Sequence, residues 1–208
     1  MTIALDVRSR TTLLDVIAQR SVVRDAAAVV AGTALVSIAA QWAIPLLPVP
    51  ITGQTFAVLF VGATLGAVRS VISMSLYVVL GTLGLPVFAA AGHGSPIGAP
   101  SGGFLFGFVL ASGLVGWLAQ RSWDRKVPTT FLAFAAGTLV IYAFGLPWLY
   151  VVLSGWTSET LVSVFGTSNV LAATVQGGLL PFMIGDVFKA ILAALLLPGF
   201  WALAKRWR

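Results

Sequence analysis

The chain of 208 residues contains no cysteine and a single histidine, His93. Without cysteine, the protein has no disulfide, no thiol nucleophile and no thiolate ligand for zinc or an iron–sulfur cluster. One histidine is too few for a metal site built from imidazole ligands. We therefore predict that the protein has neither a metal site nor a resident cofactor.

Charged residues are also scarce. They make up 9% of the chain, whereas hydrophobic residues make up 59% and the mean hydropathy is +1.01. A soluble domain has about 25% charged residues, so this chain has too few charges to cover a surface in water. Its apolar runs occupy about 120 positions, enough for six helices of about 20 residues. The predicted fold class is an all-α integral membrane protein with six transmembrane helices.

The charges that are present carry a net excess of +6, and the pI is near 10.6. In a soluble protein this excess would indicate a nucleic-acid partner. In a membrane protein, Lys and Arg in the cytoplasmic loops explain the same excess. We therefore predict the lipid bilayer, and no nucleic acid, as a partner.

The apolar runs define the predicted spans, which cover residues 25–44, 56–67, 71–85, 104–119, 131–151 and 180–204. The second and third are short for ~30 Å of hydrocarbon and must tilt, kink or extend. Residues 1–24 lack the apolar core of a signal peptide. We predict a cytoplasmic N-terminal segment at 1–24, containing a short helix or tail, and a six-helix substrate-binding domain at 25–208. The semi-polar residues 153–176 are predicted to form a long loop with partial structure.

The basic residues predict the orientation. Of the twelve Lys and Arg residues, all but Lys189 fall on one side of this topology, before span one, after spans two and four, and after span six. The loops at 45–55, 84–103 and 152–179 contain none. The positive-inside rule then places both termini in the cytoplasm.

Lys189 and Asp186 lie inside the sixth span. An ionisable side chain in a membrane span costs at least about 2.5–3.5 kcal/mol, so it normally faces protein or a wet cavity. The spacing of three residues places both on one helix face, where they can neutralise each other. Pro181 fits a first helical turn, so the pair lies about one to three turns from the outer end. We predict an outward-facing ligand pocket; an ion pair that only fixes helix packing is the alternative.

The loop at 84–103 is rich in glycine and proline. Glycine permits close backbone approach, and non-helical backbone at membrane depth persists only against protein or a cavity. One interpretation is a flexible lid over the Asp186/Lys189 pair, and the other is a surface loop with ordinary turn glycines. A lone histidine in a loop, such as His93, is more often exposed than functional.

Small residues repeat four apart in the first span, where Ala27 precedes Ala31 and Ala28 precedes Gly32. Such a face lets another helix approach closely, either a membrane partner or a helix of the same chain.

The sequence shows no enzyme motif. It has no Gly-x-Ser-x-Gly elbow, no Gly-x-x-x-x-Gly-Lys-Ser/Thr loop and no serine with a basic partner inside the bilayer. We predict that the protein is not an enzyme, and that another chain binds any ATP used in transport.

Four stretches resemble those of a known family. They are Pro48-Val-Pro-Ile-Thr-Gly-Gln-Thr55, Gly84-Leu-Pro-Val-Phe-Ala89, Pro100-Ser-Gly-Gly-Phe-Leu-Phe-Gly-Phe108 and Pro181-Phe-Met-Ile-Gly-Asp-Val-Phe-Lys-Ala190. In order and spacing they resemble the BioY family, the biotin-binding S components of energy-coupling factor (ECF) transporters, over about residues 34–205. The sequence departs from the family pattern in two places. Ala99-Pro100-Ser101 stands where Gly-Pro-Thr is usual, and Phe104 stands where tyrosine is usual.

The resemblance implies an ECF S-component fold and high-affinity biotin uptake across the cytoplasmic membrane of a prokaryote. It places the biotin pocket under the loops after spans one and three, lined by Asp186 and Lys189. Lys189 suits the valerate carboxylate and Asp186 the ureido N–H groups. The other expected substrate contacts are the side chains of Tyr77, Phe88 and Phe104 and the backbone of Gly102 and Gly103.

The resemblance also implies partners, namely a transmembrane coupling protein and ATPase subunits. The face formed by Ala27, Ala31 and Gly32 resembles the docking surface on the first helix of S components. Two other functions remain as alternatives. A solitary ion- or proton-coupled secondary carrier for a small carboxylate is disfavoured because no inverted repeat and no second intramembrane acid are present. An intramembrane enzyme is disfavoured by the missing nucleophile–base pair.

Overall fold

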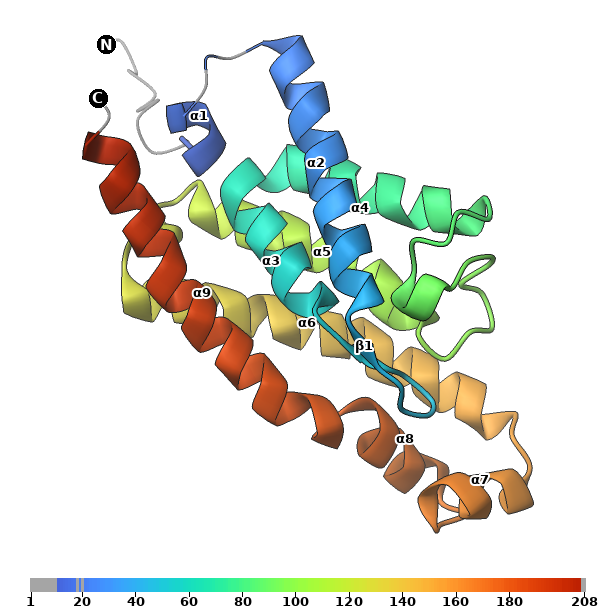
Figure 1. Ribbon diagram of the computed structural model, residues 1–208. Coiled ribbons are helices and arrows are strands. Elements are labelled where there is room, and N and C mark those ends of the chain that lie inside the picture. Colours follow the sequence, from blue (N-terminus) through green and yellow to red (C-terminus); the bar gives the residue numbers. More distant parts are fainter. Residues whose placement is uncertain (1–10, 18, 20, 207–208) are drawn as a thin grey trace, which may run out of the picture.

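The structure is a computed structural model that describes residues 11–17, 19 and 21–206 (Figure 1). Helices dominate it, which confirms the all-α prediction. The helical elements are α1 (Leu13–Ile17), α2 (Val22–Gln41), α3 (Gln54–Leu65), α4 (Ala67–Thr82), η2 (Ala89–Ala91), α5 (Gly102–Ala119), η3 (Trp123–Arg125), α6 (Val127–Ser154), α7 (Ser158–Phe165), α8 (Val170–Gly178) and α9 (Leu180–Arg206). The strands are β1 (Ala43–Ile44) and β2 (Ile51–Thr52).

Each predicted span corresponds to a helix whose ends differ from the prediction by at most four residues. Within the described chain, α2, α5, α6 and the stretch Ser158–Ala204, which contains most of α9, are long and apolar enough to cross a membrane. The remaining two, α3 and α4, are shorter apolar helices. Their length agrees with the expectation that spans two and three are short.

The first predicted span is too long at its C-terminal end. The helix ends at Gln41, and the next residues form a strand instead. Ala43 pairs with Thr52 and Ile44 with Ile51 in an antiparallel hairpin. Two paired residues per strand are too few for an alternating pattern to show in the sequence.

The semi-polar segment after α6 contains more helix than predicted. The side chain of Thr157 accepts a hydrogen bond from the Thr160 amide and starts α7, and Asn169 does the same from Ala172 at α8. Gly166, with φ of 70°, ends α7. These are the usual signals for helix starts and stops, so the two helices were readable from the sequence.

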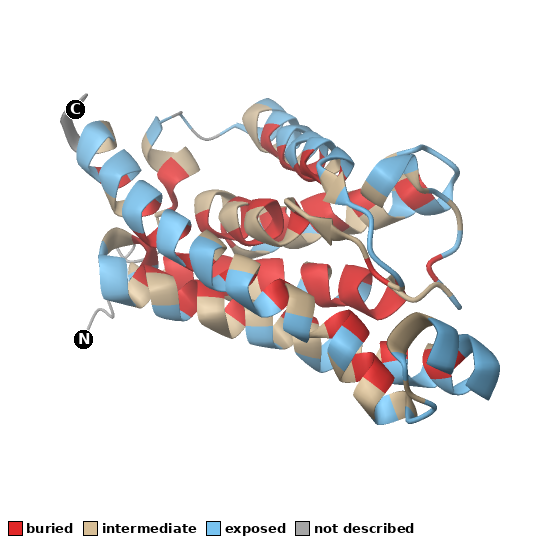
Figure 2. Cartoon of the chain, turned by 60° about the horizontal axis from the view of Figure 1, so that its bottom comes forward, coloured by how far each residue is buried: buried red, intermediate tan, exposed pale blue. Residues whose placement is uncertain are grey.

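The centre of the molecule is α5, which packs against α3, α4 and α6 and is mostly buried (Figure 2). The close contacts of α5 with α3 and with α4 both require glycine. A Cβ on Gly62 of α3 would lie 2.6 Å from the Ser112 carbonyl oxygen, and one on Gly116 would lie 2.5 Å from the Ala67 nitrogen. Polar pairs fix α2 against α4, because Thr33 Oγ1 donates to the Ser73 carbonyl at 2.9 Å.

The two ends of the bundle differ in chemistry. At one end, called here the α1 end, α1 contacts α3 and α9, and η3 also contacts α9. Asp15 of α1 pairs there with Arg24 at 3.1 Å and with Arg69 at 3.2 Å. The opposite end, called the hairpin end, carries β1, β2, η2, α7 and α8 (Figure 1). A short helix or a tail was predicted within residues 1–24, and the described part of this segment contains a short helix, α1.

Four of the basic residues that predict the orientation lie outside the described residues, namely Arg8, Arg10, Arg20 and Arg208.

Candidate binding site

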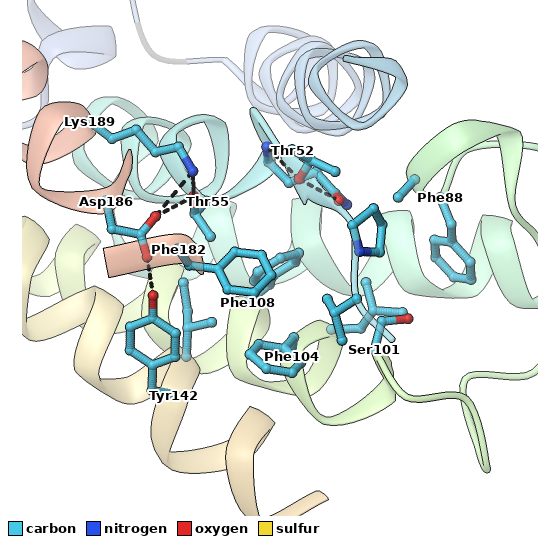
Figure 3. A pocket seen from close by; sticks show the side chains of 16 residues that line it. Thr52, Thr55, Phe88, Ser101, Phe104, Phe108, Tyr142, Phe182, Asp186 and Lys189 are labelled. Carbon is cyan, nitrogen blue, oxygen red and sulfur yellow. Dashed lines mark hydrogen bonds and ion pairs between the residues drawn. The ribbon is translucent and has the colours of Figure 1, made fainter. Parts of the chain in front are cut away.

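A pocket lies at the hairpin end, between five parts of the chain (Figure 3). The hairpin and the start of α3 form one wall, the η2 region a second, α5 a third, and α6 and α9 the remainder. The lining residues are Val49, Pro50, Thr52, Gln54, Thr55, Phe88, Ala89, Ser101, Phe104, Leu105, Phe108, Ile141, Tyr142, Phe182, Asp186 and Lys189.

Asp186 and Lys189 form the polar end of this pocket. The Asp186 side chain is 7% exposed and that of Lys189 is 21% exposed, and Lys189 Nζ lies 3.1 Å from Asp186 Oδ1. Thr55 at the start of α3 joins the pair. Its hydroxyl accepts a hydrogen bond from Lys189 Nζ at 2.6 Å and donates to Asp186 Oδ1 at 3.2 Å. Tyr142 of α6 donates its hydroxyl to the other oxygen, Asp186 Oδ2.

The sequence explains why these side chains meet. Asp186 and Lys189 occupy one face of α9, at i and i+3, and α9 packs against both α3 and α6. Thr55 lies in the first turn of α3, directly after the hairpin. The hairpin therefore leads directly into the helical turn that carries Thr55, and the packing of α9 against α3 brings Asp186 and Lys189 to it.

The body of the pocket is apolar and aromatic. Phe104 and Phe108 of α5 and Phe182 of α9 lie between the polar end and the opposite end, where Ser101 and Phe88 are found (Figure 3). Phe104 and Phe182 are 7% and 8% exposed. Such a slot suits a small ligand that is polar at one end and apolar along its body.

The other predicted contacts are divided between the pocket and its surroundings. Phe88 and Phe104 line the pocket. Tyr77 is fully buried behind it, and its hydroxyl oxygen accepts a hydrogen bond from Gln54 Nε2 at 2.6 Å. Gly103 faces α6, because its Cβ would lie 2.2 Å from Trp148 Cβ. Gly102 lies between the preceding loop and α6: its Cβ would lie 2.1 Å from the Pro96 carbonyl oxygen and 2.9 Å from Trp148 Nε1. The two glycines allow helix packing and do not line the pocket.

Sequence reasoning missed Thr55 and Tyr142. Thr55 ends one of the quoted motifs, and that position could have pointed to it. Tyr142 is a hydroxyl within an apolar run, which is a weak signal because a tyrosine in such a run finds a hydrogen-bond partner in many ways.

The small residues of α2 do not all lie on the same surface. Ala27 and Ala31 are exposed, whereas Gly32 is buried. A Cβ on Gly32 would lie 2.6 Å from Ser73 Oγ of α4. Gly32 therefore serves packing within the chain, and the exposed part of the face is Ala27 and Ala31.

The described part of the chain contains no group of three or more His, Asp or Glu residues that could hold a metal ion. The polar end offers one ammonium donor and one carboxylate acceptor, held by hydroxyls, beside an aromatic slot. Together with the long apolar helices, this arrangement is typical of a class of protein, the membrane proteins that have a candidate site for a small, largely apolar ligand between their helices. Comparison with known proteins identifies the family within that class.

The chain belongs to the BioY family, whose sequence model matches residues 9–206. It is 34% identical over 166 residues to the biotin transporter BioY of Thermotoga maritima, which covers 79% of this chain and 88% of that protein. It is 32% identical over 158 residues to the biotin transporter BioY of Rhizobium etli, covering 72% and 76% of the two chains. The family predicted from the four motifs is thus confirmed, and so is its assignment to transporters and not to enzymes.

A solved structure also shares the fold. It is the crystal structure of the S-component for biotin from an ECF-type ABC transporter, and it covers 86% of this chain and 92% of its own with a TM-score of 0.67. Its sequence is 22% identical to this one, so the likeness shows the fold alone.

Proposed function

We propose that this protein binds biotin with high affinity and takes it up as the S component of an ECF-type transporter. One observation carries the proposal. A chain of the BioY family places an ion pair of the buried Asp186 and the partly buried Lys189 at the end of an aromatic slot. The relatives from Thermotoga maritima and Rhizobium etli are named biotin transporters, and biotin has the polar and apolar parts that this slot suits.

The geometry of the pair favours one orientation of biotin. Because Lys189 Nζ and Asp186 Oδ1 are 3.1 Å apart, both contact the same end of a ligand. A ureido group offers a carbonyl and an N–H side by side, which suit an ammonium donor and a carboxylate acceptor. The thiophane ring and the methylene chain separate the valerate carboxylate from the ureido group. When the ureido group contacts Asp186 and Lys189, the carboxylate therefore lies too far away to contact them.

We therefore place the ureido ring at Asp186 and Lys189, the thiophane ring beside Phe104, and the valerate chain toward Ser101. The sequence-based expectation that Lys189 binds the carboxylate is replaced by this orientation.

We propose six transmembrane spans, formed by α2, α3, α4, α5, α6 and α9, with both termini in the cytoplasm of a prokaryotic cell. The α1 end, which carries Arg24, Arg69 and Arg125, is then cytoplasmic, in accord with the positive-inside rule. The hairpin end and its pocket face outward. Single cysteines at Ser122 and Thr167 in this cysteine-free chain test the topology. A membrane-impermeant thiol reagent added to intact cells should label Thr167→Cys and leave Ser122→Cys unlabelled, and the reverse result contradicts the orientation.

The proposed partners are a transmembrane coupling protein and ATPase subunits. The exposed residues Ala27 and Ala31 on α2 support this proposal, because small side chains let a second helix approach closely. Gly32 is left out of the proposed docking face because it is buried against α4.

Biotin titration into the purified protein, followed by calorimetry, tests the function. We expect one biotin per chain for the wild type, and weaker binding by at least tenfold for Lys189→Ala and for Asp186→Asn, because each change removes one charge-assisted hydrogen bond and leaves a buried charge without its partner. Well-folded wild-type protein that does not bind biotin would refute the proposal. If the Lys189→Ala and Asp186→Asn variants bind biotin normally but fold poorly, the ion pair serves only helix packing.

The alternative of a solitary carrier is tested by uptake. Accumulation of biotin in cells that lack ECF ATPase subunits, and its collapse when the cation gradient is removed, would favour that carrier. Uptake that needs the ATPase supports the S component.

A further inference from the structure

The chain segment around η2 forms a roof over one end of the pocket. Phe88 and Ala89 line the pocket from this side. The Phe88 ring packs edge-on against Tyr77, with ring centroids 5.4 Å apart. It fills the space above Gly81, where a Cβ would lie 2.2 Å from the ring. The side chain of Phe88 is thus seated on α4 while its backbone crosses the pocket.

The backbone of this roof is strained. Ala90 and Ala91 both have left-handed conformations, with φ of 53° and 58°. For an alanine this costs roughly 1–2 kcal/mol per residue, and such residues persist only where their surroundings hold them. The roof therefore needs an external support.

Gln41, the last residue of α2, provides that support. Its Oε1 accepts a hydrogen bond from the Ala91 amide at 2.9 Å, and its Nε2 donates to the Phe88 carbonyl oxygen at 3.3 Å. One side-chain amide thus holds both ends of the strained turn. A glutamine is well suited to this task because its amide donates and accepts at the same time.

The pocket beneath this roof is small. It encloses about 60 Å³, room for on the order of four or five water molecules. A bicyclic ligand with a side chain needs more space, so part of the wall must move when it enters or leaves. Residues 88–91 combine exposed, left-handed backbone with few ties to the rest of the wall. Backbone hydrogen bonds from Phe88 N to Gly92 O at 2.9 Å and from Gly92 N to Ala89 O at 3.0 Å close the turn itself, and Gln41 joins it to α2.

We propose that Gln41 is the positioning residue that holds residues 88–91 over the pocket and so sets the rate at which the ligand leaves. This inference rests on the proposed function, because biotin is the ligand whose release is measured. Gln41 does not line the pocket, and it acts through Phe88.

The test is the dissociation rate of biotin from the full-length protein in lipid nanodiscs. Gln41→Ala should raise this rate about 5-fold or more, because each of the two hydrogen bonds that it removes contributes at least about a factor of two. Gln41→Glu keeps an acceptor for the Ala91 amide and loses the donor to Phe88. Its dissociation rate should therefore lie between that of the wild type and that of Gln41→Ala. Gln176→Ala, which truncates an exposed glutamine on α8 at the same end of the molecule, is the matched control and should leave the rate unchanged.

Hydrogen–deuterium exchange without ligand gives a second, independent result. In Gln41→Ala, the amides of residues 88–94 should exchange faster, while those of α5 should not change. Equal exchange in variant and wild type overturns the proposal. Faster exchange with an unchanged dissociation rate also overturns it, because Gln41 would then hold a loop that does not control release. If the wild type binds no biotin, the proposed function fails, and the exchange result still decides whether Gln41 holds the segment.

Discussion

Thr55 shows how a single uncharged residue can stabilise a partly buried ion pair. Its hydroxyl accepts from Lys189 Nζ and donates to Asp186 Oδ1. The attraction between two buried charges only balances the cost of removing them from water when further hydrogen bonds satisfy them. At this site the further bonds come from Thr55 and from the Tyr142 hydroxyl.

We predict that Thr55→Val destabilises the ligand-free protein by about 1.5–3 kcal/mol, because hydrogen bonds to charged groups contribute about that much. Thr55→Ser retains the hydroxyl and should cost less than about 1 kcal/mol. Thermal unfolding in detergent, followed by tryptophan fluorescence, measures both. If the valine and serine variants unfold at the same temperature, Thr55 contributes packing only.

For single residues, the sequence predicted the two charged side chains of the site but not the hydroxyl groups that form hydrogen bonds with them. Asp186 and Lys189 stand out because any charge in an apolar run is conspicuous. Thr55 and Tyr142 do not, because their hydroxyls are common in membrane helices and their partners lie far away along the chain. Which hydroxyl reaches Asp186 depends on how α3 and α6 approach α9, and that is a property of packing.

At the scale of elements, the glycines of α5 show the same limit. Hydropathy predicts where α5 begins and ends to within two residues of the observed Gly102–Ala119, because a membrane span depends on the total apolar length. Which face a glycine serves depends on the neighbouring helix. Gly102 and Gly103 were expected at the substrate, and they lie instead against α6, where Trp148 Nε1 also donates to the Ala99 carbonyl at 2.9 Å.

We predict that Gly103→Ala lowers the free energy of unfolding by about 1–3 kcal/mol, the usual cost of overpacking a close contact. The new Cβ would lie 2.5 Å from the Phe144 carbonyl oxygen, a backbone atom that cannot turn away. Gly199→Ala in α9 is the control, because nothing lies within 4 Å of that Cβ. Thermal unfolding of both variants measures the effect.

Biotin affinity of the folded Gly103→Ala protein should stay close to that of the wild type. A large loss of biotin affinity without loss of stability would instead show that Gly103 contacts the substrate.

At the scale of the whole molecule, buried carboxylates at the α1 end tie together elements that are far apart in the sequence. Asp15 joins α1 to Arg24 and Arg69. Asp124 of η3 is 2% exposed and accepts a hydrogen bond from Trp201 Nε1 of α9 at 2.6 Å. The guanidinium of Arg125 lies 4.3 Å from the centre of the same tryptophan ring. The apolar spans thus create the bundle, and these contacts fasten its α1 end.

The two carboxylates respond to pH in opposite directions. Burial acts to raise the pKa of Asp15, but hydrogen bonds from the Thr12 amide and from Arg69 outweigh it and hold the pKa at about 2. Its contribution to stability is therefore present above about pH 4 and is lost only as the pH falls toward 2. Burial raises the pKa of Asp124 to about 6, although the Trp201 indole and Arg125 act against the shift.

For Asp124 the folded state holds the proton more tightly than the unfolded chain, whose aspartates titrate near pH 3.9. The free energy of unfolding should therefore fall as the pH rises from about 4 to about 6, by at most about 3 kcal/mol, and change no further above that range. Asp124→Asn retains an oxygen for Trp201 Nε1 and cannot ionise, so this fall should be absent from the variant. Melting temperatures of wild type and variant, compared at about pH 4 and about pH 7, measure the difference and cancel the other titrating groups, which both proteins share. Parallel pH profiles would show that Asp124 stays ionised in the folded protein, and the tie between η3 and α9 would then be a charge-assisted hydrogen bond throughout this range.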